Sequence, residues 1–178
     1  DLSINTVYYT VNFHLPVHWL HGLGYAAKAG ELLKERRAKA PLVLTDPVVR
    51  EKGVADAVLE SLETAGLKYE ICDLFAAEPT VKFFDDTVKN LNLNRFDSVI
   101  AVGGGSVLDS AKALAVVAKY GGSIRQYAGR DKIPERPDWI NLSIPTTAGT
   151  GSEVSDGAVF IDEEAGTKFI MMSKKVCP

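Results

Sequence analysis

The sequence predicts an α/β fold in which a mostly parallel sheet is flanked by helices on both faces. Two observations predict it. Short apolar runs rich in β-branched residues are bounded by Asp, Gly or Pro, as buried parallel strands are. The segments between these runs carry apolar residues at helical spacing. Strands and helices therefore alternate along most of the chain, which is typical of a parallel sheet with helical crossovers.

The alternating elements begin with a helix and continue into the carboxyl-terminal part of the chain. The predicted strands are 40–46, 68–74, 97–103 and 139–145, and the predicted helices are 25–38, 54–65, 80–94 and 107–118. Gly66 directly follows the second of these helices, at the position where glycine commonly ends a helix.

The two ends of the chain follow a different pattern. Residues 157–171, GAVFIDEEAGTKFIM, predict two strands around a turn, a hairpin at the margin of the sheet. Residues 6–22, TVYYTVNFHLPVHWLHG, predict two short strands broken at Pro16. We find no repeat and no internal linker, so the sequence predicts a single domain.

The composition excludes several classes of function. The net charge is −3, the pI is about 5.6 and the basic residues are scattered, so we expect no nucleic-acid partner. No apolar run approaches the ~20 residues that span a bilayer, and no signal for export is visible, so we expect no membrane association. Cys72 and Cys177 are too far apart for a C-x-x-C motif and too few for a disulfide framework, which predicts a cytoplasmic protein with packed cysteines.

Gly103, Gly104, Gly105 and Ser106 lie between a predicted strand and a predicted helix. Amide groups at a helix start and the positive end of the helix dipole attract an anion, and a phosphate is the natural occupant. Glycine permits a diphosphate to approach main chain that a Cβ would block. Two alternatives remain open. In the first, the glycines serve only to make a tight turn. In the second, the S-x-x-D pattern of Ser106 and Asp109 serves only to cap the helix.

A second loop follows another predicted strand at residues 145–155, PTTAGTGSEVS. It places Thr146, Thr147, Thr150 and Ser152 around two glycines, and their hydroxyl groups offer hydrogen bonds to phosphate or ribose oxygens. Ligands of open α/β sheets bind at the carboxyl ends of the strands. The two loops are therefore expected to converge on one ligand.

Asp46 ends the first predicted strand and is expected at the same edge of the sheet. A carboxylate there accepts hydrogen bonds from the diol of an adenine ribose. The alternative is that Asp46 caps a helix that begins at Pro47.

The order of these features excludes two common nucleotide motifs. In the ordinary Rossmann fingerprint the glycines come first and the acid follows about 20 residues later, whereas here Asp46 precedes the glycines. The P-loop pattern G-x-x-x-x-G-K-[ST] is absent from the sequence.

Instead, the chain resembles the iron-containing (group III) alcohol dehydrogenases, with glycerol dehydrogenase and dehydroquinate synthase as more distant relatives. The resemblance covers nearly the whole chain and rests on GGGSVLDSAK at 103–112 and PTTAGTGSEVS at 145–155. Supporting matches are HGLG at 21–24, LVLTD at 42–46, EPT at 78–80 and GTKF at 166–169. It implies that residues 1–178 form an NAD-binding domain, a Rossmann-like fold similar to the amino-terminal domain of dehydroquinate synthase.

The resemblance implies a role for each matching residue. Gly104, Gly105 and Ser106 would bind the cofactor diphosphate, and Thr146, Thr147 and Thr150 would line the diphosphate and ribose channel. Asp109 would lie near the nicotinamide, and Lys168 would reach a ribose hydroxyl unless it is a bare surface lysine. Asp46 would hold the adenine ribose and favour NAD over NADP, because a carboxylate next to a 2′-phosphate is unfavourable.

The resemblance also implies a metal that this sequence is not expected to bind. The family holds Fe²⁺, sometimes Zn²⁺, through one Asp and three His of a helical carboxyl-terminal domain, which we expect to be absent from this chain. His14, His18 and His21 are not expected to form a metal site, because Pro16 breaks a shared helical face and no carboxylate accompanies them. We therefore expect neither catalytic residues nor metal ligands in these residues.

The function implied is the cofactor-binding part of a metal-dependent oxidoreductase that transfers a hydride between a primary alcohol or diol and NAD. The small-molecule partner would be an alcohol or aldehyde, and the full-length enzyme is expected to be a homo-oligomer. Two alternatives remain open: a stand-alone nucleotide-binding module without catalysis, and a relative of glycerol dehydrogenase or maleylacetate reductase.

Overall fold

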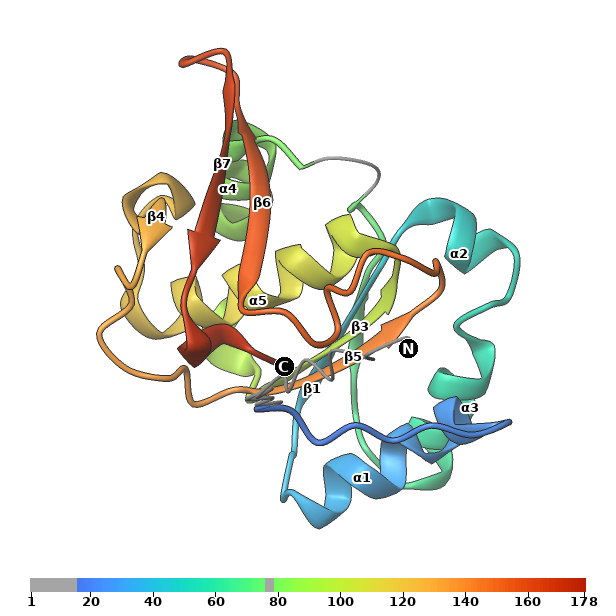
Figure 1. The fold of residues 1–178 in the computed structure, drawn as a ribbon. Helices are drawn as coiled ribbons and strands as arrows, with labels where there is room; N and C mark the ends of the chain where they lie inside the picture. Colours follow the sequence, from blue (N-terminus) through green and yellow to red (C-terminus); the bar gives the residue numbers. More distant parts are fainter. Residues whose placement is uncertain (1–15, 76–78) are drawn as a thin grey trace, which may run out of the picture.

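The computed structural model describes residues 16–75 and 79–178. They form a four-stranded sheet covered by helices on both faces and a second, three-stranded sheet beside it (Figure 1). The predicted α/β class, with its parallel sheet and flanking helices, is confirmed. The part of the predicted opening strands that precedes Pro16 lies outside the described residues.

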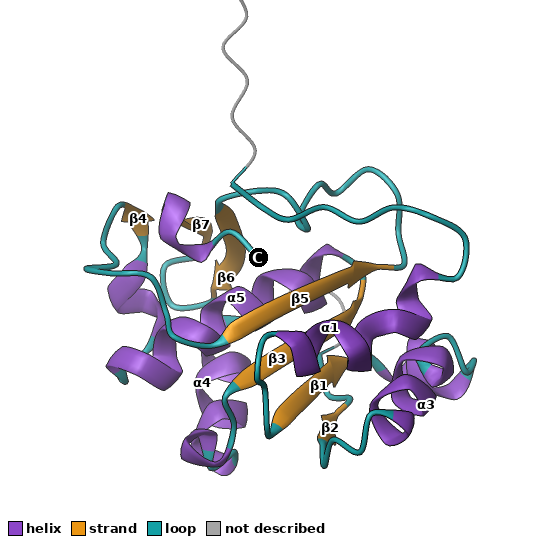
Figure 2. Ribbon diagram, turned by 90° about the horizontal axis from the view of Figure 1, so that it is seen from below, coloured by secondary structure: helices purple, strands orange, loops and turns teal. Residues whose placement is uncertain are grey.

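The larger sheet contains the four predicted strands and is entirely parallel. The strands are β1 (Pro41–Thr45), β2 (Glu70–Cys72), β3 (Ser98–Gly103) and β5 (Ile140–Pro145), in the order β2-β1-β3-β5. Figure 2 shows β5 at one edge of this sheet and β2 at the other. The register pairs Thr45 with Val102 and Gly103 with Pro145, so β1, β3 and β5 end side by side.

Alternate residues of the strands face two different cores. Leu42, Leu44, Val99 and Ala101 pack with α4 (Val81–Asn90) and α5 (Gly105–Tyr120). Val43 and its neighbours pack with helices on the opposite face, namely η1 (Tyr25–Lys28), α1 (Ala29–Glu35) and α3 (Asp56–Thr64). This alternation is why the two central strands, β1 and β3, are buried along their whole length and mostly apolar, as the sequence indicated.

The predicted helices form with small differences at their ends. Helix 25–38 begins as a 3₁₀ turn and ends at Glu35, and helix 80–94 ends at Asn90 before a separate turn. Gly66 follows α3 with a φ of 70°, as predicted for a helix-ending glycine. The remaining helical segments are α2 (Pro47–Glu51), η2 (Leu93–Arg95), η3 (Ile124–Tyr127) and η4 (Lys174–Val176).

The predicted hairpin forms, but its predicted position at the margin of the parallel sheet is wrong. Strands β6 (Gly157–Asp162) and β7 (Thr167–Met172) are antiparallel and join β4 (Gly129–Arg130) in the order β4-β7-β6. Phe160 is buried, and its ring meets that of Phe84 on α4 at a centroid distance of 5.2 Å. The hairpin therefore buries its apolar face on the helices α4 and α5 instead of extending the sheet.

The strand predicted after Pro16 does not form. Residues 16–22 are irregular, and none of the described backbone hydrogen bonds joins them to a strand. Among the described residues, no helix is long and apolar enough to cross a membrane.

Candidate nucleotide-binding site

The two loops singled out by the sequence lie against each other at the carboxyl ends of β3 and β5. The amide of Thr146 donates to the carbonyl oxygen of Gly103 at 2.9 Å. A Cβ built on Gly104 would lie 3.4 Å from Oγ1 of Thr147. The parallel register of β3 and β5 produces this contact, because it brings Gly103 opposite Pro145.

The start of α5 is formed by glycine. The segment with Thr146, Thr147, Thr150 and Ser152, residues 146–152, lies closely against it and is called the hydroxyl loop below. Gly104 precedes the helix, and none of the described side chains caps it there. A Cβ on Gly105 would lie 3.2 Å from Cβ and Cγ2 of Thr150 and 3.3 Å from Oγ of Ser152. Such contacts are tighter than most Cβ contacts, so glycine at position 105 allows Thr150 and Ser152 to lie against the start of α5.

Gly103 is required for a different reason. A Cβ there would come within 2.6 Å of Cγ2 of Val107 on the first turn of α5. The tight turn therefore explains why residue 103 is glycine. The close approach of Thr150 and Ser152 explains why residue 105 is glycine.

A cavity of about 210 Å³ lies between the start of α5, the hydroxyl loop and the hairpin. Among the predicted cofactor residues, its walls include Gly105, Ser106, Asp109, Thr150 and Lys168. The other lining residues are Pro79, Ser152, Val159, Phe160 and Ile161. The structure thus brings residues of four separate sequence segments to one cavity, whose lining combines hydroxyl groups with apolar side chains.

Asp109 borders this cavity but is engaged by the chain itself. Its Oδ2 accepts a hydrogen bond from the amide of Val159 at 3.0 Å, and its Oδ1 accepts one from Nζ of Lys112 at 3.3 Å. The alternative that Ser106 and Asp109 form a cap is wrong, because α5 already begins at Gly105 and Asp109 reaches β6 instead. Burial lowers the pKa of Lys112, and the Asp109 carboxylate opposes that shift.

The remaining predicted residues lie at the same sheet edge but outside this cavity. Gly104 and Thr147 are neighbours, and Thr146 is bonded to Gly103. Asp46 follows β1 and accepts hydrogen bonds from the amides of Val48 and Val49, both at 2.9 Å. The helix-capping interpretation of Asp46 is therefore confirmed, since it caps α2.

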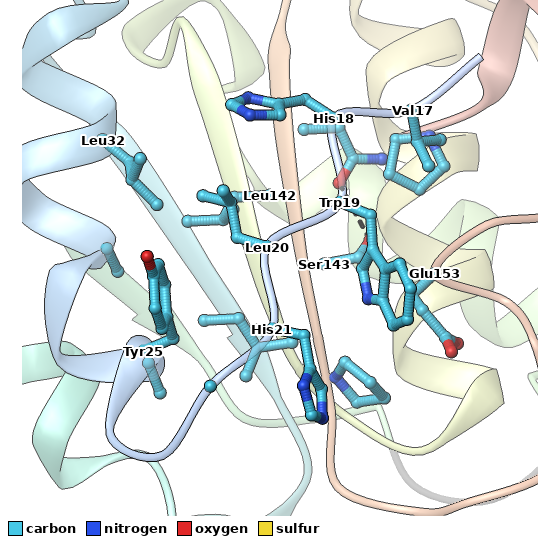
Figure 3. A pocket seen from close by; sticks show the side chains of 17 residues that line it. Val17, His18, Trp19, Leu20, His21, Tyr25, Leu32, Leu142, Ser143 and Glu153 are labelled. Atoms are coloured by element: carbon cyan, nitrogen blue, oxygen red, sulfur yellow. Dashed lines mark hydrogen bonds between the residues drawn. The ribbon is translucent and has the colours of Figure 1, made fainter. Parts of the chain in front are cut away.

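A larger cavity, about 360 Å³, lies along the outer edge of β5 (Figure 3). Trp19, His21 and Tyr25 line it together with residues 141–145, and it contains none of the predicted cofactor residues. Its walls are mainly apolar and aromatic, and its carboxylate, Glu153, has a buried Oε2 with no hydrogen-bond partner among the described residues. A carboxylate in an apolar wall disfavours a diphosphate, so this cavity does not fit the predicted ligand.

The described residues do not fit a bound metal ion. Within residues 16–75 and 79–178, no three His, Cys, Asp or Glu side chains are grouped so that they could hold one. His18 shares a hydrogen bond of 2.8 Å with Arg36 through its Nδ1. His14 lies outside the described residues.

Two kinds of residue at the site were missed by the sequence interpretation. Val159, Phe160 and Ile161 form the apolar wall, and only their position in a predicted hairpin was visible in advance. Lys112 was visible in the same motif as Asp109, and a spacing of three residues on a helix places the two side chains on one face.

Comparison with known proteins identifies the family. The family model for iron-containing alcohol dehydrogenases matches residues 16–178. The chain belongs to this family. Among the iron-containing alcohol dehydrogenases and their relatives, it is 36% identical over 159 residues to choline dehydrogenase of Bacillus subtilis (strain 168), covering 88% of this chain and 40% of that protein.

Further matches are named for activities with nicotinamide cofactors. The chain is 32% identical over 167 residues to NAD-dependent methanol dehydrogenase of Bacillus methanolicus, covering 94% of this chain and 44% of that protein. The crystal structure of NADH-dependent butanol dehydrogenase A from Thermotoga maritima superimposes with a TM-score of 0.84 at 29% identity, covering 95% of this chain and 42% of that one. The chain therefore spans less than half the length of these members of the iron-containing alcohol dehydrogenase family.

Proposed function

We propose that these residues form the NAD-binding domain of an oxidoreductase that transfers a hydride between a primary alcohol or diol and NAD. One observation carries the proposal: the glycine loop and the hydroxyl loop, which are far apart in the sequence, converge on the start of α5 and border one cavity. The relatives named NAD-dependent and NADH-dependent support the choice of nucleotide.

The residues of the site suit the parts of NAD in different ways. The amides of Gly104, Gly105 and Ser106, at the positive end of the α5 dipole, would hold the diphosphate. The hydroxyl groups of Thr146, Thr147 and Thr150 would line the diphosphate and ribose channel.

The side chains around the two riboses complete the proposed site. Lys168 on the cavity wall would reach a ribose hydroxyl. Asp46 would accept from the adenine ribose while it continues to cap α2, because a carboxylate oxygen has more than one lone pair. Asp109 would border the nicotinamide side.

The fit of NAD is supported by the cavity of about 210 Å³ beside the start of α5. Gly105 adds no side chain to its wall, where a Cβ alone would lie 3.2 Å from Thr150. When bound, NAD supplies the acceptor for the hydride of the alcohol. The described residues would orient that acceptor, and the apolar side chains Val159 and Ile161 would cover one side of it.

We also propose that the metal-binding part of the enzyme lies outside these residues. A metal ion would stabilise the alcohol oxygen as its proton leaves, and the described residues offer no group that fits one. The 178-residue chain is therefore expected to bind nucleotide without oxidising alcohols.

Calorimetric titration with NAD tests the site. Gly105→Val should abolish NAD binding, because the isopropyl group would enter the cavity wall at a point where a Cβ alone lies 3.2 Å from Thr150. Ala118→Val is the matched control, since it places the same side chain on the same helix away from the cavity. Unchanged NAD binding by a folded Gly105→Val variant would refute the assignment.

The stand-alone binding module is the second candidate, because it requires no more than the two loops and the cavity that the described residues contain. A comparison of the full-length protein with this chain separates the two candidates. The assay measures NADH formation from primary alcohols and diols under anaerobic conditions with added Fe²⁺ or Zn²⁺. Turnover by the full-length protein alone supports the dehydrogenase. Metal-dependent turnover by the purified 178-residue chain would show that a metal site has been overlooked.

Two finer expectations accompany this proposal. The full-length enzyme is expected to be a homo-oligomer, which light scattering at known concentration measures. A cytoplasmic location is supported by Cys72 and Cys177, which are both buried and free, as is usual in a reducing compartment.

A further inference from the structure

Strand β6 is the last strand of its sheet among the described residues, yet backbone groups along its outer edge are paired. The amide of Val159 donates to Oδ2 of Asp109 at 3.0 Å, and the carbonyl oxygen of Gly157 accepts from Nζ of Lys112 at 2.7 Å. The next alternate residue, Ile161, donates its amide to the carbonyl oxygen of Pro79 at 3.2 Å. Two side chains of α5 therefore bond to the edge of β6 where a neighbouring strand would otherwise lie.

Lys112 is the centre of this arrangement. Its side chain has no exposed surface, and that of Asp109 is only 10% exposed. Besides Gly157 and Asp109, the ammonium group donates to Oγ of Ser155 at 3.1 Å. Ser155 belongs to the segment that leads from the hydroxyl loop into β6, so one buried group joins the helix, the loop and the strand.

The geometry excludes direct binding of a ligand by Lys112. An ammonium group has three hydrogen-bond donors, and here they are matched by Asp109, Ser155 and Gly157. Lys112 also does not line the cavity. A role in the site must therefore act through the groups that it holds.

We propose that Lys112 is a positioning residue that fixes β6 and the loop before it against α5, and so sets the width of the cavity for the nicotinamide half of NAD. This inference rests on the proposed function. Both walls of the cavity meet at this contact, because Gly105 and Ser106 lie on α5 while Val159 and Ile161 lie on β6. Asp46 lies beside the proposed adenine site and bonds to Val48 and Val49, not to the contact between Lys112 and β6.

The test compares NAD with AMP, which carries only the adenine half. Lys112→Met keeps the length of the side chain and removes its donors. NAD should bind about tenfold or more weakly to this variant, while the dissociation constant for AMP stays within about twofold of the wild-type value. A general loss of folded protein would weaken the binding of both ligands. A weaker affinity for NAD with an unchanged affinity for AMP therefore distinguishes a positioning role from an effect on stability.

Two further variants keep the test decisive if Lys112→Met fails to fold around the unpaired Asp109. Asp109→Asn combined with Lys112→Met removes both charges. Ser155→Ala leaves the ion pair intact and removes one bond of the ammonium group. Each variant should bind NAD more weakly and bind AMP as the wild type does. The loss of NAD affinity should be smaller for Ser155→Ala.

Lys119→Met is the matched control, since the ammonium of Lys119 on the same helix binds Asp138 and the carbonyl oxygen of Arg136 instead. It should leave both ligands unaffected. Folded variants that bind NAD as the wild type does would overturn the positioning role alone. A wild-type chain that binds no NAD would instead refute the proposed function.

Discussion

Asp46 has a structural role that the chain itself explains. Its carboxylate accepts from two amides at the start of α2, with Pro47 in the first helical position. A cap alone does not require a charge, because Asn caps helices about as well as Asp. A charge at the adenine ribose is required only if the residue also discriminates NAD from NADP.

Substitutions at Asp46 separate these two roles. Asp46→Asn should leave thermal stability nearly unchanged and narrow the preference for NAD over NADP by about 1 to 3 kcal/mol, since the repulsive charge is gone. Asp46→Ala should in addition lower the free energy of unfolding by about 1 kcal/mol through loss of the cap. Calorimetry with both cofactors and denaturant titration measure the two effects. An unchanged NAD to NADP affinity ratio in Asp46→Asn would place Asp46 outside the ribose site.

The single-residue predictions are most specific where a motif names both the residue and its neighbours. Gly105 and Thr150, from two loops expected at one sheet edge, border one cavity with Lys168, which only the family resemblance placed there. Their roles toward NAD stay predictions. The bond from the amide of Val159 to Asp109 could not be predicted, because that contact depends on where the hairpin packs.

At the scale of elements, the hairpin shows what local pattern leaves open. The alternation in residues 157–171 predicted two strands and their turn, and both formed. A period of two says which side chains face inward but not which surface receives them. Here α4 and α5 supply that surface, and Phe160 lies between the rings of Phe84 and Phe169.

Removing the ring of Phe160 tests this packing. Phe160→Ala should lower the free energy of unfolding by about 3 to 5 kcal/mol, because it opens a cavity in a buried aromatic cluster. Ile170→Ala on β7 is the comparison, since that side chain is 43% exposed and should cost about 1 kcal/mol or less. Equal losses in the two variants, measured by urea denaturation, would contradict the observed packing.

The hairpin turn carries a dependence on pH. Oδ1 of Asp162 accepts from the amides of Ala165 and Glu164 and from Arg125. The hydrogen bond from Ala165, aided by the charge of Arg125, holds the pKa of Asp162 below its ordinary value of 3.8. The stabilisation is therefore fully present above pH 3.8 and is lost as the pH falls through the lower pKa of the folded state.

Thermal unfolding of wild type and Asp162→Asn over a pH series measures this contribution. The wild type should be the more stable protein near neutral pH, and the difference should close below pH 3.8 as the carboxylate is protonated. A difference that stays constant throughout the series would show that the charge of Asp162 does not stabilise the turn.

For the whole molecule, the alternation of strands and helices was predictable because the central strands β1 and β3 are buried on both faces and form nearly continuous apolar runs. The second sheet was not predictable as a separate unit, since its third strand, β4, has only two residues, Gly129 and Arg130. The irregular course of residues 16–22 was missed for a related reason: alternation of side chains does not ensure a partner strand.

The site as a whole depends on these features together, because the parallel register brings the ends of β3 and β5 side by side and the hairpin closes the cavity between them. A titration of the isotope-labelled chain with NAD, followed by amide chemical shifts, tests this convergence most directly. The largest shifts should occur at Gly104, Gly105 and Ser106 and at residues 146–150. Shifts confined to the cavity around Trp19 and Tyr25 along β5, or no shifts at saturating NAD, would contradict the account.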